Sequence, residues 1–189
     1  MTNTINLGQL YLNLADDTSK ISAMSKTVLH RFYEYVIEDI GRGLTIVPTD
    51  KNYSYQEMEA MYQRQFLPIF AGGSDGSLGI PKLTERAAHE IIHMITGNDF
   101  TSSGEYKVCL DTLRLFDSFV KYKFNYISET VSHQCKQIIY SEVHLQSCAY
   151  HYLGEFPDTQ KIVLTHLPRY EREFLNWSSL DKKLVRSKK

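Results

Sequence analysis

The chain has few cysteines and little net charge, and each shortage excludes a class of protein. Its three cysteines, Cys109, Cys135 and Cys148, are an odd number without the spacing of metal ligands. A disulfide scaffold is therefore excluded, and we expect the three cysteines to serve as small apolar residues of a protein in the reducing cytoplasm. A net charge of −1 gives no electrostatic basis for binding nucleic acid.

The sequence also lacks a long apolar run. No uninterrupted stretch approaches the ~20 residues that a bilayer-crossing helix needs. The N-terminus lacks the basic start and apolar stretch of a secretory signal. We therefore expect a cytoplasmic protein without a transmembrane segment. The basic residues 181–189 leave a peripheral contact with an anionic membrane open, and a homodimer stays open as well.

Apolar periodicity predicts an all-α fold, a compact helical bundle in which residues 1–189 form a single domain. Residues 1–18 and 181–189 are expected to be flexible tails. Helices are predicted from Ile21 to Gly41, from the capping box at Ser54–Glu57 to Pro68, from 85 to 96, after Glu105, and from 131 to 152, with a loop at 43–52. The glycine-rich stretch 71–81 is a candidate lid or pocket wall.

The segment His89-Glu90-Ile91-Ile92-His93 carries the most chemical information. On a helix these three polar side chains fall on one arc about 100° wide, which is a suitable face for a divalent transition metal. Thr84 is the expected N-cap and Gly97 the expected left-handed end of this helix. The turn-rich run from 97 to 104 then predicts a short loop, so that the next helix packs antiparallel and Glu105 reaches back toward the histidines.

This pattern resembles the coenzyme Q biosynthesis protein 4 family. The shared features are His-acid-x-x-His at 89–93, Ile-Thr-Gly at 95–97, and Gly104-Glu105 after an eleven-residue spacer. The resemblance implies His89, Glu90, His93 and Glu105 as metal ligands in an all-helical fold. It also implies a hydrophobic pocket for a prenylated substrate, as in ubiquinone biosynthesis. Glu90 departs from the Asp of the family, and the family's second motif has only a faint echo at 75–79.

A zinc peptidase is the main rival interpretation. His-Glu-x-x-His is the signature of these enzymes, with Glu90 as the general base that activates water. Asp99 lies six residues after His93, where some such enzymes have a third ligand. The glycine at Gly97 is one residue late for that geometry, however, and no methionine follows Met94 to form the methionine turn.

Glu142 falls on the apolar seam of the helix predicted over 131–152, where an unpaired carboxylate is costly. Two roles are open for it: a partner of a ligating histidine, or an acid–base group with a raised pKa. Rotation of the helix toward solvent is the alternative. His133, His144 and His151 lie near one line of this helix and are expected at its surface or rim.

These observations predict a metal-dependent enzyme, with zinc or iron, acting on a small hydrophobic or aromatic metabolite, and the family resemblance implies a prenylated or quinone-like one. The metal would serve as a Lewis acid, or as Fe(II) in oxygen chemistry. Glu90 and Glu142 are the candidate catalytic residues. A lipid-binding or assembly protein with a structural metal is a further alternative, distinguished by a closed, dry site.

Overall fold

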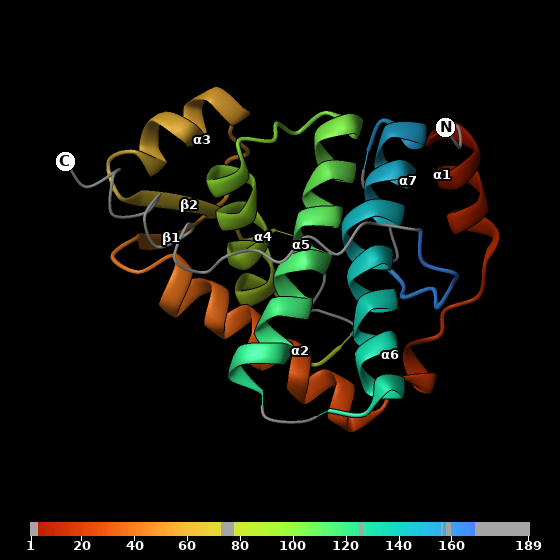
Figure 1. The fold of residues 1–189 in the computed structure, drawn as a ribbon. Helices are drawn as coiled ribbons and strands as arrows, with labels where there is room; N and C mark the ends of the chain where they lie inside the picture. Colours follow the sequence, from red (N-terminus) through yellow and green to blue (C-terminus); the bar gives the residue numbers. More distant parts are fainter. Residues whose placement is uncertain (1–3, 73–77, 125–126, 156, 158–159, 169–189) are drawn as a thin grey trace.

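A computed structural model describes residues 4–72, 78–124, 127–155, 157 and 160–168 of the chain. The helices are α1 (Thr4–Asn13), α2 (Ala23–Tyr35), α3 (Tyr55–Tyr62), α4 (Lys82–Thr96), α5 (Ser102–Lys123), α6 (Glu129–Ile139) and α7 (Gln146–Leu153). Short turns of other helical types are η1 (Thr18–Lys20), η2 (Val36–Ile40) and η3 (Tyr140–Leu145). The sequence predicted an all-α bundle, and the described fold is mostly helical but contains two short strands (Figure 1). The basic residues 181–189 lie outside the described residues.

Two strands are present that the sequence analysis missed. Strands β1 (Thr45–Thr49) and β2 (Phe66–Phe70) pair in parallel, with Thr45 opposite Phe66, and α3 connects them. The loop predicted at 43–52 is therefore partly a strand, and the helix predicted to reach Pro68 ends at Tyr62. The cause is burial: Leu67 and Ile69 are almost fully buried. A proline is tolerated in each strand because each has a free edge in a two-stranded sheet.

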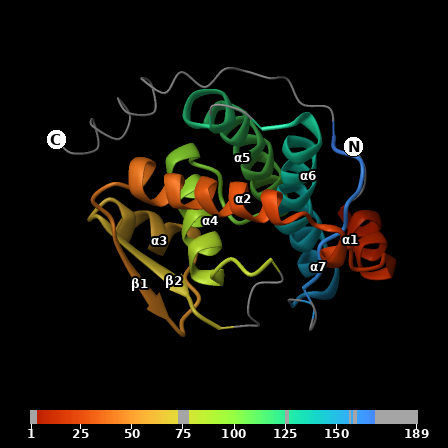
Figure 2. The same cartoon turned by 90° about the horizontal axis from the view of Figure 1, so that it is seen from below.

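The N-terminal segment also differs from the expectation. Residues 4–13, predicted as part of a flexible tail, form α1, which packs along α7 at the opposite side of the molecule from the strands (Figures 1 and 2). Gly8 makes this packing close, because a Cβ atom built there would lie 2.4 Å from the carbonyl oxygen of Cys148. Tyr11 is fully buried, and its hydroxyl donates to the carbonyl oxygen of Lys161. These contacts hold α1 in place, although its apolar pattern is too short to have predicted a helix.

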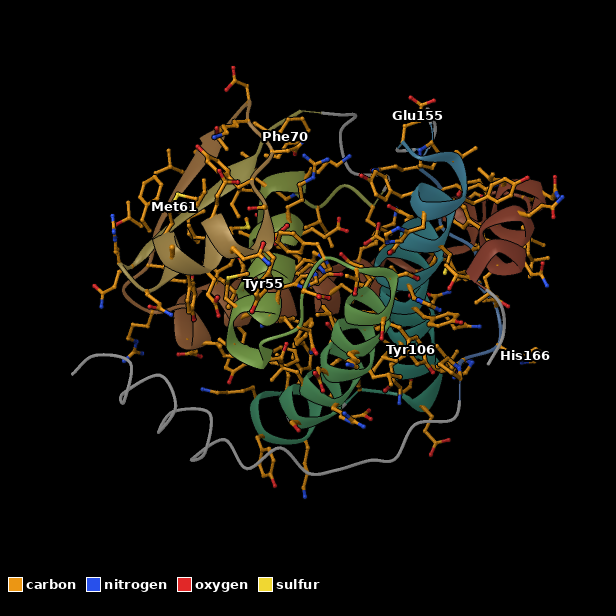
Figure 3. All side chains as sticks on the ribbon, turned by 90° about the horizontal axis from the view of Figure 1, so that it is seen from above. Tyr55, Met61, Phe70, Tyr106, Glu155 and His166 are labelled. Carbon is orange, nitrogen blue, oxygen red and sulfur yellow. The ribbon has the colours of Figure 1, made fainter. Side chains whose placement is uncertain are left out.

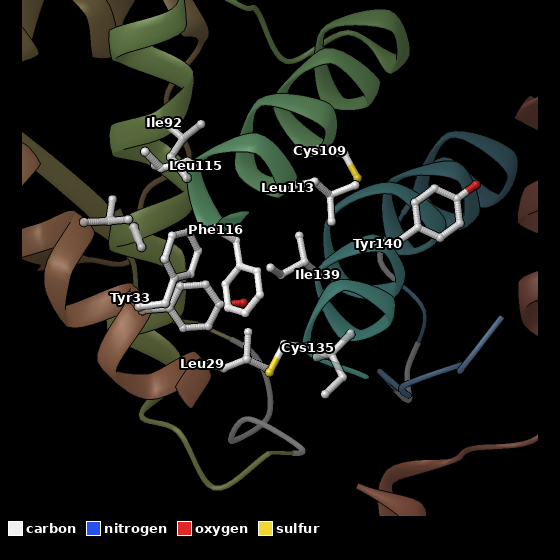
Figure 4. Close-up of a cluster of buried hydrophobic side chains, with 14 of the residues drawn as sticks. Leu29, Tyr33, Ile92, Cys109, Leu113, Leu115, Phe116, Cys135, Ile139 and Tyr140 are labelled. Atoms are coloured by element: carbon white, nitrogen blue, oxygen red, sulfur yellow. The ribbon is translucent and has the colours of Figure 1, made fainter. Parts of the chain in front are cut away.

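The main core lies where α2, α4, α5 and α6 meet. Figure 4 shows Leu29 and Tyr33 of α2 packed with Ile92 of α4 and with Leu113 and Phe116 of α5. Phe32 meets Phe116 edge to face, with ring centroids 5.4 Å apart. All three cysteines are free and buried, as expected for small apolar residues. Among the described residues, no helix combines the length and apolar character required to cross a membrane.

Residues at the helix ends determine where each helix starts and stops. The capping box at Ser54 and Glu57 is confirmed, and Gly97 ends α4 in the left-handed conformation with φ of 70°. The N-cap predicted at Thr84 was wrong, because helix α4 begins after Pro81, three residues earlier. Thr101 caps α5 by accepting a hydrogen bond from the backbone N–H of Gly104. A proline suits the start of a helix because it gives up no needed donor.

The α1–α7 contact predicts a sign reversal at Gly8. Replacing a helical glycine by alanine usually stabilises a protein by about 0.5–1 kcal/mol. For Gly8→Ala we expect a loss of about 1–3 kcal/mol, because the new methyl group would overlap a backbone carbonyl that cannot rotate away. Urea denaturation measures the change, with the exposed neighbour Gln9→Ala as control. Equal stability of both variants and the parent would contradict the packing of α1.

Candidate metal centre and adjoining cavity

Two helices bring three ligand-type side chains together. His89 and His93 of α4 and Glu105 of α5 offer ligand atoms that all lie within 4.8 Å of one another. The two Nε2 atoms are 3.0 Å apart. Glu105 spans the pair, with Oε2 3.4 Å from Nε2 of His89 and Oε1 3.4 Å from Nε2 of His93. The sequence analysis predicted this convergence of the three side chains from the eleven-residue spacer.

The three side chains are close enough together to share a metal ion. Ligand atoms about 2.0–2.1 Å from a tetrahedral ion are separated by about 3.3 Å along each edge. The two histidine nitrogens are 3.0 Å apart, and each of them lies 3.4 Å from a different oxygen of Glu105. The orientation of His93 agrees as well, because its Nδ1 lies 2.9 Å from the carbonyl oxygen of Asn98. An N–H donated there leaves the Nε2 lone pair free for a cation, which is the usual arrangement of a ligating histidine.

The surrounding chain holds this geometry in place. Gly97 turns the chain sharply after α4, and Asp99 accepts hydrogen bonds from the backbone N–H and the hydroxyl of Thr101. Gly104 lies against the same turn, where a Cβ atom would come within 2.0 Å of the carbonyl oxygen of Asp99. This close approach sets Glu105 in the first turn of α5, where a carboxylate also meets the favourable end of the helix dipole.

Aromatic rings buttress the histidines from the side of α3. Phe100 packs edge to face on the ring of His93, with centroids 4.8 Å apart, and Tyr55 packs on Phe100 in the same way at 5.6 Å. Figure 3 shows Tyr55 at the start of α3, beside the loop that joins α4 and α5. His93 itself is fully buried. The rings therefore restrict its rotation.

Electrostatics link the three side chains without any ion. Burial by itself lowers the pKa of His89, but Glu105 outweighs burial and raises that pKa to about 9. For Glu105, burial raises the pKa, but His89 and His93 together move it well below the ordinary value. Metal-free protein is therefore expected to hold a protonated His89 beside an ionised Glu105. A bound cation would replace that proton.

Glu90, the fourth predicted ligand, is not part of the cluster of three. It lines a cavity next to the histidines, and its Oε2 atom is buried without a hydrogen-bond partner among the described residues. Burial raises the pKa of Glu90, against the opposing effect of the two histidines. The cause of its position is the helix itself, since Glu90 is turned 100° from His89, while His93 is only 40° away.

The cavity that adjoins the cluster has a volume of about 560 Å³. His89 and Glu105 reach its wall, and much of the remaining wall is apolar or aromatic, including Met58, Ile69, Phe70, Ile92, Phe100 and Val143. Phe70 at the end of β2 and Glu155 just after α7 both line it, and both lie along the same edge of the molecule (Figure 3). The sequence predicted a hydrophobic cavity here. The missed β2 forms part of its wall, whereas 73–77 of the predicted lid lie outside the described residues.

The continuous helix α6–η3–α7 contains Glu142 and His144 in its π-helical segment η3. Glu142 lines the cavity, and burial, followed by the neighbouring Glu85, raises its pKa well above the ordinary value. His144, expected at the surface or rim, is buried against Tyr106 and Tyr140, and burial lowers its pKa to about 4. The wider π-helical turn of η3 holds both residues and changes the facing of the helix. His133 and His151 are exposed as predicted.

Arg86 is a site residue that the sequence analysis missed. Its guanidinium donates hydrogen bonds to the carbonyl oxygens of Phe70 and Gly72 and lies over the ring of Phe70. It thereby ties the end of β2 to α4 beside the cavity. Arg86 lies about one turn before His89, so the sequence could have placed it near the histidines. Its partners, however, lie in and just after strand β2, which apolar periodicity did not reveal.

Comparisons with known proteins identify no relative of this chain. No family model, no curated protein and no solved structure matches it.

The pKa shifts predict how the stability of metal-free protein depends on pH. The raised pKa of His89 contributes stability that is complete below the unfolded value of 6.5 and is lost as pH rises to about 9. The lowered pKa of Glu105 contributes stability above 4.5 that is lost as pH falls. Chemical denaturation of the chelator-treated protein should show both losses. In His89→Gln the loss between pH 6.5 and 9 should disappear, and an unchanged profile would contradict the ion pair.

Proposed function

We propose that this chain is a metal-dependent enzyme that acts on a small apolar or aromatic molecule. The observation that carries the proposal is the convergence of His89, His93 and Glu105, of which His89 and Glu105 reach the wall of a 560 Å³ cavity. Two imidazoles and one carboxylate leave a coordination position open, which is typical of catalytic sites, whereas structural zinc sites have four protein ligands. The cavity volume falls within the range of small-molecule sites.

The donor set suits Zn²⁺ or Fe²⁺, because nitrogen and oxygen ligands of this kind accept both. When bound, such an ion supplies Lewis acidity toward a carbonyl or carboxylate oxygen, or, as iron, oxygen chemistry. His89, His93 and Glu105 would hold it. The aromatic and aliphatic wall would bind the body of the ligand and exclude water from the reacting group. The resemblance to the coenzyme Q biosynthesis protein 4 family supports a prenylated or quinone-like ligand.

A zinc peptidase is the second candidate, because one observation favours it. Two histidines of His-Glu-x-x-His with a glutamate from a later helix are the donor set of the thermolysin type. Glu90 would then be the general base. Two sequence features count against it, however: Gly97 is one residue late for the turn of such enzymes, and no methionine follows Met94 to form the methionine turn. A structural metal is less favoured, because the cluster opens onto a cavity.

Removal of each predicted ligand tests the metal site. We expect His89→Ala, His93→Ala and Glu105→Gln each to lower zinc affinity by about 100-fold or more. Loss of a residue that only hydrogen-bonds to a metal ligand already lowers affinity by about 10- to 100-fold, and loss of the ligand itself should cost at least as much. Metal analysis of tag-free protein and zinc titration calorimetry give the values. The exposed His133→Ala is the matched control and should bind zinc like the parent. Equal affinity of all four variants would refute the site.

Glu90→Gln separates the two candidate enzymes. Because Glu90 lies outside the cluster of ligand atoms, we expect the variant to keep the zinc content of the parent. If the chain acts on a small apolar molecule, the parent protein should not cleave fluorescent casein. Binding of a prenylated benzoate should then quench the intrinsic fluorescence of the zinc-loaded protein. Cleavage of casein by the parent, lost in Glu90→Gln with zinc retained, would instead establish the peptidase.

A further inference from the structure

A second polar group in the cavity lies one turn of α4 away from the histidines. Glu85 of α4 and Glu142 of η3 both line the cavity, and Glu85 is near enough to Glu142 for its side chain to raise the pKa of that carboxyl. Glu85 precedes His89 by four residues, which corresponds to about 6 Å along the helix. The two carboxyl groups therefore share a cavity with the metal cluster, at a separation that a ring-sized molecule spans.

The contact between Glu85 and Glu142 requires a proton. The Oε2 atom of Glu142 is inaccessible to solvent, and no N–H or O–H group among the described residues donates to it. Two ionised carboxylates in contact in such surroundings repel each other strongly, and one of them retains a proton, as in the aspartic proteases. Burial and Glu85 both raise the pKa of Glu142.

The other titratable groups near Glu142 do not replace this proton. Lys82 of α4 lowers the pKa of Glu142, but it is the smallest of the four influences on that pKa, and its ammonium group donates to Gln160. Tyr11 of α1 and Tyr33 of α2 have pKa values raised chiefly by burial and further by Glu142, so both phenols stay neutral. Beside these neutral phenols and the engaged ammonium group, the carboxyl pair is the group around Glu142 that can take up and release a proton.

We propose that Glu85 and Glu142 form a proton-sharing carboxyl pair that is the acid–base group of the cavity. The proposal rests on the proposed function for its partner, the metal cluster at the other end of the cavity. As a base, the pair breaks an O–H or C–H bond of the ligand. The bonding electrons stay on the ligand atom, and the proton bonds to the free carboxylate oxygen. The pair then carries no charge, which a low-dielectric cavity favours, and the reverse step returns the proton.

An aromatic epoxide, 1,2-epoxy-3-(4-nitrophenoxy)propane, tests the pair in the protein without metal. One carboxylate attacks an epoxide carbon and forms an ester, while the C–O bond of the ring breaks and the oxygen takes the proton of the partner carboxyl. Esterification therefore needs both members. We expect one adduct, located by peptide mass spectrometry on Glu85 or Glu142. Its rate should fall by about tenfold or more in either Glu85→Gln or Glu142→Gln, as for the loss of a general acid or base.

Three controls make the result decisive. Glu155→Gln removes another carboxylate of the cavity wall and should leave the rate unchanged. Thermal denaturation must show that both Gln variants fold; if one does not, Glu85→Asp or Glu142→Asp takes its place and should also slow labelling. His89→Ala should lose zinc but keep the adduct, so failure of the metal site and failure of the pair are distinguishable. No adduct on either residue, or a rate unaffected by loss of the partner, would overturn the proposal.

Discussion

The carboxylate of Glu105, placed between two imidazole rings, is the interaction around which the α4–α5 unit is organised. His93 is completely buried and Glu105 nearly so, and each would be costly to bury without the other. Their contact also fixes the two helices against sliding, because a shift of one residue along either helix would move a ligand atom by about 1.5 Å. The tight loop from 97 to 101 and the glycine at Gly104 follow from this constraint. Only a short and closely packed turn places Glu105, in the first turn of α5, level with the two histidines of α4.

The sequence contained enough local information to predict this unit. The histidine spacing, the glycine end of α4 and the spacer to Glu105 all act within 17 residues, and short-range patterns describe such distances well. The strands and α1 were missed for the opposite reason. Parallel strands gain their stability from each other and from burial of Leu67 and Ile69 beneath more distant elements, and five-residue segments that contain a proline have no distinctive period. Likewise α1 is held by α7, whose sequence lies more than 130 residues away.

The continuous helix from 129 to 153 shows a subtler limit. A regular helical wheel assigned Glu142 to the apolar seam, and it does face the cavity, but the same wheel assigned His144 to the surface or rim, and His144 is buried. A π-helical turn accommodates one additional residue, so the residues after it are displaced by about 100° from their expected direction. Nothing in the local sequence requires such a turn, because its cost is offset by packing of Tyr106 and Tyr140 around His144. The wheel is therefore a reliable guide only up to the first irregular turn.

The cavity has an excess of carboxylates that its bases do not balance. Glu85, Glu90, Glu105, Glu142 and Glu155 line it, against the cations Lys51, Lys82 and Arg86, of which Lys82 and Arg86 also donate to amide and carbonyl oxygens. An apolar wall makes such an excess unfavourable unless protons or cations compensate it. Protonation of His89 compensates Glu105 in metal-free protein, and a shared proton would compensate the pair on the other side. A divalent cation would raise the local positive charge by more than the proton it replaces, and so would favour ionisation of the remaining acids. Binding of a metal would thus be coupled to proton exchange in this cavity through one electrostatic field, which is the arrangement that acid–base chemistry next to a Lewis acid requires.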